Sequence, residues 1–528
     1  MKKTFLAIFA VFALFIVGCS QSSNTDEQDN NDEKEQEQEV QAGGELKIAV
    51  SAQPPTLDGH LSTAIIMMEI GRNIFETLVA LDENLVPQPL LAESIDRSDD
   101  GLTYTFNLRE GVLFHNGEEM KAEDVVASMN RWLENSPLSD TIGNDAFQET
   151  DEYTVTVELD EPVSDLLDIM AGLGRGQYTP IMPKEIVESA TESGVSEYIG
   201  TGPFKFTEWR QDQYIHLEKF EDYQSIDSAA SAISGKREAL VDDVYYYFVA
   251  DDSTRLAGIQ TGEYDVADNM PFDSYDQLQS MDGVNMYVAP SGTQNIIYNK
   301  KEGIMSDAKL RQAVNAALNT EAIMLASFAN ENLYELEHGY MSTDQTSWAS
   351  SAGSESYNQN DIEKAKQLAE EAGYNGEEII IMTTSDYDYM YNTAVVAQEQ
   401  LKSAGFNAKL DVYDWATSID RRNDPANWDI FVTSTAFVTS PSQLLALDPN
   451  WGGWTSDPQI TELMEQIRLS TTQEDADEHW DTLQGYLWDE YLPMTIVGHH
   501  HRIVAARDHV KGLEVFPGAI PWNTSVDK

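Results

Sequence analysis

The one long apolar stretch of this chain lies at its start and ends beside its only cysteine. Phe5 to Val17 are all apolar and follow the basic residues Lys2 and Lys3, and Cys19 comes two positions later. The stretch is shorter than the roughly 20 residues that a membrane-spanning helix needs, and the sequence contains no second one. A single cysteine excludes an internal disulfide framework and any metal site with several cysteine ligands. The rest of the chain must therefore be stabilised by its own apolar core, for which a hydrophobic content of 41% suffices.

Residues 1–19 have the layout of a secretory signal peptide, with a basic start and an apolar middle. The segment Ile16-Val17-Gly18-Cys19 resembles a bacterial lipobox, which implies cleavage before Cys19 and attachment of lipid to it. A plain signal peptide with a chance cysteine is the alternative. Residues 20–43 are rich in acids and amides and nearly free of apolar side chains, so we expect a disordered acidic tether. The chain is thus predicted to be extracytoplasmic and lipid-anchored to the outer face of a bacterial cell membrane.

The charge of the chain excludes several kinds of partner. Asp and Glu total 91 against 32 Lys and Arg, which gives a formal net charge of −59. A field of that sign repels phosphate backbones and anionic lipid surfaces. We therefore expect no nucleic-acid partner, and no membrane contact apart from the lipid anchor.

Motifs of enzyme catalysis are missing from the sequence. It contains neither the G-x-S-x-G pattern of a nucleophilic serine nor the H-E-x-x-H pattern of a zinc hydrolase. The glycine-rich run Gly172–Gly176 leads into Gln177–Pro180 and not into a helix, so it does not match a phosphate-binding loop. We predict that the chain is not an enzyme and carries no cofactor.

Periodic apolar patterns predict a mixed α/β body. Residues 46–50, 103–108 and 153–159 alternate between apolar and polar side chains or are β-branched, as half-buried strands are. Residues 244–249 are apolar nearly throughout, which predicts a strand buried on both faces. Apolar side chains at helical spacing predict helices over residues 122–134, 310–325, 362–372 and 391–404.

Short motifs follow one another in a fixed order along the body. They are Gly44-Glu45-Leu46, Pro55–Asp58, Leu91–Ser94, Leu102–Gly117, Ala122–Val125, Gly200–Phe204, Gly262–Asp265, Asp307 with Leu310–Val314, and Glu371–Tyr374. In order and spacing these motifs resemble the extracytoplasmic solute-binding proteins of family 5, the peptide/nickel substrate-binding lipoproteins of ABC transporters. The resemblance extends from Gly44 to the C-terminus. Most of these residues are turn glycines, strand cores and helix starts, so they indicate fold and family and not the ligand.

The resemblance implies an α/β fold of the periplasmic-binding-protein type II, a two-lobed clamshell with an extra inserted domain. Lobe I is expected over residues 44–77, 197–288 and 503–528, the inserted domain II over 78–196, and lobe III over 289–502. Two hinge crossings are expected near residues 289–291 and 498–502. Closure about the hinges would present a peptide or peptide-like solute to an ABC permease with its cytoplasmic ATPase, and we expect the binding protein to be a monomer.

Ligand residues are expected where the resemblance places the cleft. They are Thr293, Gln294 and Asn295 after the first hinge, then Trp415, Ser434, Thr435 and Phe437. For Trp415, a place in the buried core is the alternative. Dipeptide-binding members hold the ligand ammonium with an Asp that would fall near Val438, so a longer peptide, a modified peptide or another amide-rich solute is favoured here. Arg421 and Arg422 are expected on a helix surface and not at the ligand carboxylate.

Three adjacent histidines leave a second ligand class open. In a strand, His499 and His501 share a face, where two imidazoles could contact a metal or a metal chelate. The alternative functions are therefore a nickel-chelate or other metal-chelate importer component and, in another class, a clamshell sensory receptor.

Overall fold

The computed structural model describes residues 42–136, 138–171, 178–342 and 344–527. Cys19, the predicted signal peptide and nearly all of the predicted tether lie outside these residues, as does the run Gly172–Gly176. Within the described part of the chain, no helix combines the length and the apolar character needed to cross a bilayer.

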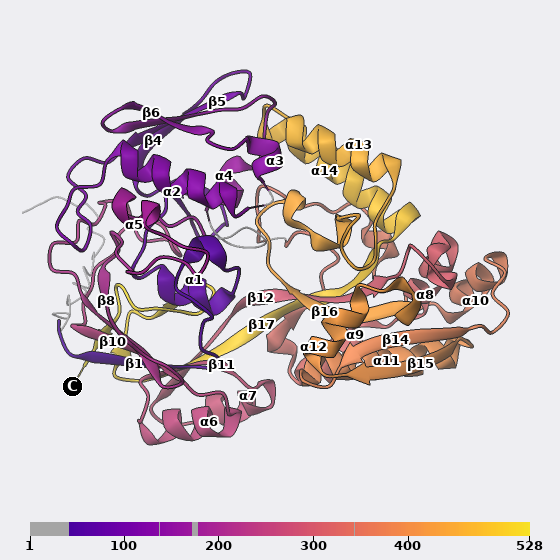
Figure 1. Ribbon diagram of the computed structural model, residues 1–528. Coiled ribbons are helices and arrows are strands. Elements are labelled where there is room, and N and C mark those ends of the chain that lie inside the picture. Colours follow the sequence, from indigo (N-terminus) through magenta and orange to yellow (C-terminus); the bar gives the residue numbers. More distant parts are fainter. Residues whose placement is uncertain (1–41, 137, 172–177, 343, 528) are drawn as a thin grey trace, which may run out of the picture. The chain divides into compact units, whose positions relative to one another are not determined.

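One large mixed sheet carries the fold (Figure 1). Its eleven strands run in the order β15, β14, β16, β12, β17, β11, β1, β10, β9, β8, with β13 paired to β17 off this path. The bounds are β1 (Glu45–Val50), β8 (Phe204–Arg210), β9 (Tyr214–Lys219), β10 (Asp243–Phe248), β11 (Val266–Met270), β12 (Val284–Tyr298), β13 (Tyr334–Glu335), β14 (Glu378–Thr384), β15 (Asn407–Tyr413), β16 (Ile430–Ala436) and β17 (Met494–Arg507). Parallel pairs join β1 to β10 and β11, and β14 to β15 and β16, whereas the other described pairs of this sheet are antiparallel.

A separate antiparallel sheet lies within the region predicted as the inserted domain. Its order is β4 (Ala92–Arg97), β5 (Thr103–Leu108), β7 (Thr154–Glu158), β6 (Phe147–Asp151). Three short pairs complete the described strands: β2 (Val79–Leu81) with β3 (Pro87–Pro89), β18 (Val510–Lys511) with β21 (Ser525–Val526), and β19 (Glu514–Val515) with β20 (Ala519–Ile520). In β5, Tyr104, Phe106 and Leu108 are buried and the residues between them are half-exposed, as the alternation predicts.

Two long neighbouring strands connect the ends of the large sheet (Figure 1). β12 and β17 pair antiparallel from Val284 opposite Arg507 to Ile297 opposite Met494. The expected hinge positions lie in the middle of these strands, where the register shifts between Pro290 and Gly292. Proline cannot donate to the ladder, and a Cβ on Gly292 would lie 2.3 Å from the carbonyl oxygen of Thr435, so this irregularity is encoded locally.

Buried apolar side chains form two clusters. The first core includes Leu46, Trp132 and Trp522, and the second includes Trp428 and Trp488. The described α-helices are α1 (Ile65–Gly71), α2 (Ala122–Glu134), α3 (Ser139–Ile142), α4 (Leu166–Met170), α5 (Lys184–Glu188), α6 (Asp252–Thr261), α7 (Tyr275–Gln279), α8 (Ala308–Ala317), α9 (Thr320–Phe328), α10 (Ile362–Glu371), α11 (Asp388–Ala404), α12 (Trp415–Arg422), α13 (Pro458–Leu469) and α14 (Gln473–Tyr486). Two cores joined by two long strands agree with the two-lobed expectation, while the exact domain boundaries remain predictions.

Two predictions of secondary structure need correction. The helix expected over residues 310–325 is two helices, because Asn319 caps the start of α9 by accepting the backbone N–H of Ala322. β10 is not buried on both faces: Val244 and Tyr246 are buried, but Tyr245 and Tyr247 are partly exposed and pack against one another and against Tyr214. Tyrosine supplies both an apolar ring and a polar hydroxyl, so an apolar run rich in Tyr does not require full burial.

Candidate functional site

A cavity of about 390 Å³ lies against one face of β12 and β16. Helix α12, residues 437–446 and Trp451 contribute further walls, and Tyr340, Ser342 and Gln345 come from the chain between β13 and α10. Thr63, two residues before the first-core helix α1, also lines the cavity. The cavity therefore combines a residue next to the first core with residues around the second, and we take it as the candidate site.

Six of the seven predicted ligand residues line this cavity: Thr293, Asn295, Trp415, Ser434, Thr435 and Phe437. Gln294 is the exception, and its side chain is completely buried. It lies between Thr293 and Asn295 on β12, and successive side chains of a strand project from opposite faces. The prediction for Gln294 is therefore corrected, because its side chain projects from the face of β12 opposite to Thr293 and Asn295 and is not among the lining residues.

Asn295 offers an unused hydrogen-bond acceptor at the cavity wall. Its Nδ2 donates to the carbonyl oxygen of Thr293 at 3.0 Å and to the Oγ1 of Thr435 at 2.8 Å. Its Oδ1 is buried and has no hydrogen-bond partner among the described residues. A buried acceptor without a partner costs free energy, so a ligand N–H placed here would be stabilised.

Trp415 is a wall residue and not a core residue. It is the first residue of α12, which Asp414 caps by accepting the backbone N–H of Thr417. The indole is half-buried, lines the cavity and packs edge-on against Tyr387 at 5.4 Å between ring centroids. By contrast, Trp428 is only 2% exposed and belongs to the second core.

Two residues that sequence reasoning missed complete the α12 side of the cavity. Arg422 and Trp451 both line it, and the Arg422 guanidinium lies 4.7 Å from the centroid of the Trp451 ring. Arg422 is partly exposed on α12, as expected, but it also lines the cavity: it is seven residues after Trp415, which places both on one face of the helix. Arg421 instead lies over Tyr413 at 4.5 Å and does not line the cavity.

The guanidinium of Arg422 is a desolvated cation without a described acidic partner. Burial lowers its pKa, and no neighbouring carboxylate contributes an opposing shift. Its Nε is buried and makes no hydrogen bond to the described residues. A half-buried charge in this state can be complemented by an anion, and a guanidinium matches a carboxylate in shape.

The three histidines of β17 have separate partners. His499 lines the cavity and its Nε2 is 2.9 Å from the carbonyl oxygen of Gly339, while burial lowers its pKa. His501 lies 3.5 Å from Glu335, and His500 faces the other side of the strand, 2.7 Å from Ser434. Within the described ranges, no group of three His, Cys, Asp or Glu side chains comes together in a way that could hold a metal ion.

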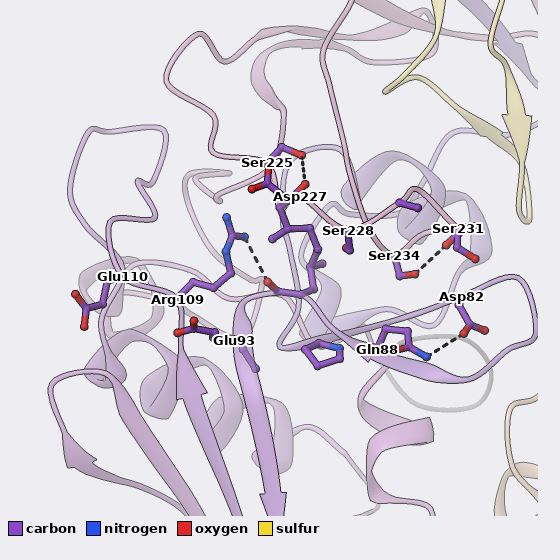
Figure 2. Close-up of a pocket in the computed structure, with 16 residues that line it drawn as sticks. Asp82, Gln88, Glu93, Arg109, Glu110, Ser225, Asp227, Ser228, Ser231 and Ser234 are labelled. Carbon is purple, nitrogen blue, oxygen red and sulfur yellow. Dashed lines mark hydrogen bonds between the residues drawn. The ribbon is translucent and has the colours of Figure 1, made fainter.

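A larger and more open hollow of about 950 Å³ lies apart from this cavity, between residues 82–110 and 225–235 (Figure 2). Its charged lining residues are Asp82, Glu93, Arg109, Glu110 and Asp227. Arg109 donates to the carbonyl oxygen of Leu90 at 3.3 Å, and Gln88 donates to Asp82 at 2.9 Å, so these polar groups are paired within the wall. None of the predicted ligand residues lines this hollow, which leaves the smaller cavity as the candidate site.

Comparison with known proteins decides the family. The model of bacterial extracellular solute-binding proteins, family 5 (middle region), matches residues 86–454. The chain belongs to this family. It is 27% identical over 494 residues to the probable peptide ABC transporter periplasmic-binding protein y4tO of Sinorhizobium fredii, with 88% of this chain and 90% of that protein covered. It is 28% identical over 472 residues to the oligopeptide-binding protein AppA of Bacillus subtilis, with 83% and 81% covered.

A solved structure confirms the fold of this family-5 protein. The ABC transporter substrate-binding protein CtaP of Listeria monocytogenes superposes with a TM-score of 0.78 at 22% identity, covering 89% of this chain and 95% of that one. The predicted α/β, two-lobed binding-protein fold is therefore confirmed, as is the predicted family. Members of the family are solute-binding proteins and not enzymes, in agreement with the sequence analysis.

Proposed function

We propose that this family-5 protein is the substrate-binding component of an ABC importer and captures peptides or peptide-like solutes in the cavity beside β12, β16 and α12. The family and the peptide-binding names of its relatives support this class of ligand. The observation that carries the proposal is Arg422, a half-buried guanidinium at the cavity wall without an acidic partner among the described residues. The terminal carboxylate of a peptide complements it.

The other walls suit a ligand rich in amides. Asn295 has a free acceptor for a ligand N–H, and the hydroxyl of Thr433 lies nearby on β16. Trp415 and Trp451 provide flat aromatic faces for the apolar parts of a peptide. Val438 also lines the cavity, and the resemblance implies that the ammonium-binding Asp of the dipeptide-binding members would fall near it. A longer or modified peptide is therefore proposed over a dipeptide.

We further propose that the ligand is enclosed by bending of β12 and β17 near residues 289–291 and 498–502. In support, a set of contacts joins the chain beside Val163 of the first core to the end of α13, which packs in the second core through Ile467. The backbone N–H of Ser164 donates to the carbonyl oxygen of Arg468 at 2.9 Å, and its hydroxyl donates to the carbonyl oxygen of Ile467 at 2.8 Å. Arg468 also pairs with Glu161 at 2.8 Å. These contacts would break if the cores moved apart, so they would hold an enclosed state.

Delivery would follow the scheme of a tethered ABC binding protein. The protein would be held at the outer face of the membrane by lipid on Cys19, act as a monomer, and present the enclosed solute to the permease and its ATPase. Replacing Cys19 by Ala should release the protein into the medium or leave it unprocessed. Incorporation of labelled palmitate into Cys19→Ala at the wild-type level would contradict the anchor.

Native mass spectrometry of the purified full-length protein with a peptide library tests the function. We expect retention of peptides of about three or more residues and, in X-ray scattering, a smaller radius of gyration when peptide is saturating. A protein that retains no peptide, but binds a nickel chelate in a manner abolished by EDTA, would replace the peptide proposal with the metal-chelate alternative.

A further inference from the structure

A second cavity, of about 330 Å³, adjoins the first. The two share Thr63, Ser342, Ala436 and Phe437 as lining residues. The second cavity, which we call the side pocket, is therefore separated from the first by no more than these four residues.

Apolar side chains dominate the walls of the side pocket. Ile65 and Met68 come from one face of α1, and Phe516 and Pro517 come from the turn between β19 and β20. On the second-core side, Phe437 belongs to both cavities. Ile65 is 41% exposed, so a large part of its apolar side chain is in contact with water in the empty protein. Its apolar surface would be removed from water by a ligand group in the side pocket.

The basic groups that reach the side pocket are already paired. Arg72 donates through Nη2 to the carbonyl oxygens of Gly518 at 3.3 Å and Ala519 at 3.1 Å. Arg502 pairs with Glu69 at 2.6 Å and with Asp268 at 3.0 Å.

Arg237 is paired in the same way. It lies 3.5 Å from Glu76 and donates a hydrogen bond to the carbonyl oxygen of Ile233. The other charged side chains of the side pocket, Glu83 and Asp344, are exposed and negative. An acidic ligand group would therefore lose its hydration beside two carboxylates, and the guanidinium groups it meets already donate to carbonyl or carboxylate oxygens.

We propose that the side pocket receives one large apolar side chain, aromatic or branched, of the peptide bound in the first cavity, and rejects an acidic one. This proposal rests on the proposed function and adds to it a rule of specificity at one ligand position. Burying a Phe or Leu side chain that would otherwise stay in water corresponds to an affinity gain of about 10–100-fold.

Alanine peptides with a single replaced position test the side pocket. Isothermal titration of the full-length protein would compare tetra-alanine with the four peptides that carry one Phe, and with the four that carry one Asp. We expect one position at which Phe improves affinity about 10–100-fold over Ala, and at which Asp gives weaker binding than Ala.

Two variants then connect that preference to the side pocket. Ile65→Trp fills the pocket and Ile65→Ser removes part of its apolar wall, so both should lose most of the Phe preference while binding tetra-alanine as the wild type does. The matched control is Ile362→Trp, because Ile362 is also the first residue of a helix and is 37% exposed, yet lines neither cavity. Melting temperatures of all three variants would show that the fold is retained.

The outcomes separate this inference from the function on which it rests. If tetra-alanine binds but no position prefers Phe, or if both Ile65 variants keep the preference, the side pocket does not bind a ligand side chain. The proposed peptide binding would still be supported in that case. If no peptide binds at all, the proposed function fails and the inference fails with it.

Discussion

Replacing Arg422 by Gln is the most direct test of carboxylate recognition in the cavity. In the empty protein the guanidinium lies over Trp451 at 4.7 Å and has no acidic partner among the described residues. Removing the guanidinium therefore leaves no buried carboxylate without its ion-pair partner. The free energy of unfolding should change by no more than about 1 kcal/mol, which is the size of the cation–π contact that is lost.

The effect on binding should be much larger. A hydrogen bond to a charged group contributes about 1.5–3 kcal/mol, so Arg422→Gln should weaken binding of a peptide with a free carboxylate about 10–150-fold. Arg421→Gln is the matched control, because Arg421 lies on the same helix over Tyr413 and outside the cavity. Its affinity should equal that of the wild type.

Titration calorimetry with paired peptides, free and amidated at the C-terminus, separates the carboxylate contact from general damage to the site. The wild type should lose affinity on amidation, and Arg422→Gln should be nearly indifferent to it, since each change removes one partner of the same contact. If amidation weakens binding to both proteins by the same factor, Arg422 does not hold the carboxylate and the reasoning is refuted.

Three further changes test other parts of the structure. Trp415→Ala should weaken peptide binding about 5–150-fold at nearly constant melting temperature, because its indole is a half-buried cavity wall. By contrast, Trp428→Ala in the second core should lower the free energy of unfolding by about 3–5 kcal/mol, as thermal unfolding would show. Asp58→Asn should destabilise the empty protein by about 3–5 kcal/mol, since it breaks the buried ion pair of Asp58 with Arg131 at 2.7 Å. Lys366→Ala, which breaks the exposed ion pair with Glu363, should change the free energy of unfolding by under about 1 kcal/mol. Burial lowers the pKa of His60 and His500 to about 3 and that of His115 to about 4, so the unfolded chain binds more protons below pH 6.5. The stability present above pH 6.5 should therefore be lost as pH falls toward 3, by up to about 1.4 kcal/mol per pH unit for each group. Urea titrations at several pH values give the free energy of unfolding, which should fall less steeply with decreasing pH in His500→Phe than in the wild type.

The family and most secondary structure could be predicted because they depend on local pattern and on motif order. The alternation in residues 103–108 predicts β5, and the turn and helix-start motifs occur in the order of the family. Errors arose where two local rules competed. The apolar spacing over residues 310–325 favours one helix, but Asn319 prefers to cap a new one, and the structure follows the cap.

The site was harder to predict because it is assembled from distant segments. Asn295 bonds to Thr435, 140 positions away, and only the pairing of β12 with β16 decides which face of β12 lines the cavity. That is why Gln294 could not be separated from its neighbours in advance. The seven-residue spacing of Trp415 and Arg422 was visible in the sequence, yet it gains meaning only when the buried face of α12 is known.

The charges at the cavity also bear on ligand length. The resemblance to dipeptide-binding members implies an Asp near Val438 that would hold the ligand ammonium, and a second charge at the carboxylate would then fix one ligand length. Here the described residues lining the cavity include Arg422 and Val438 but no carboxylate. A ligand fixed by charge at one end only is free to extend at the other, because no second charge imposes a separation. Selectivity would then come from the carboxylate end and from the side chain nearest the side pocket, while the number of residues would change affinity gradually.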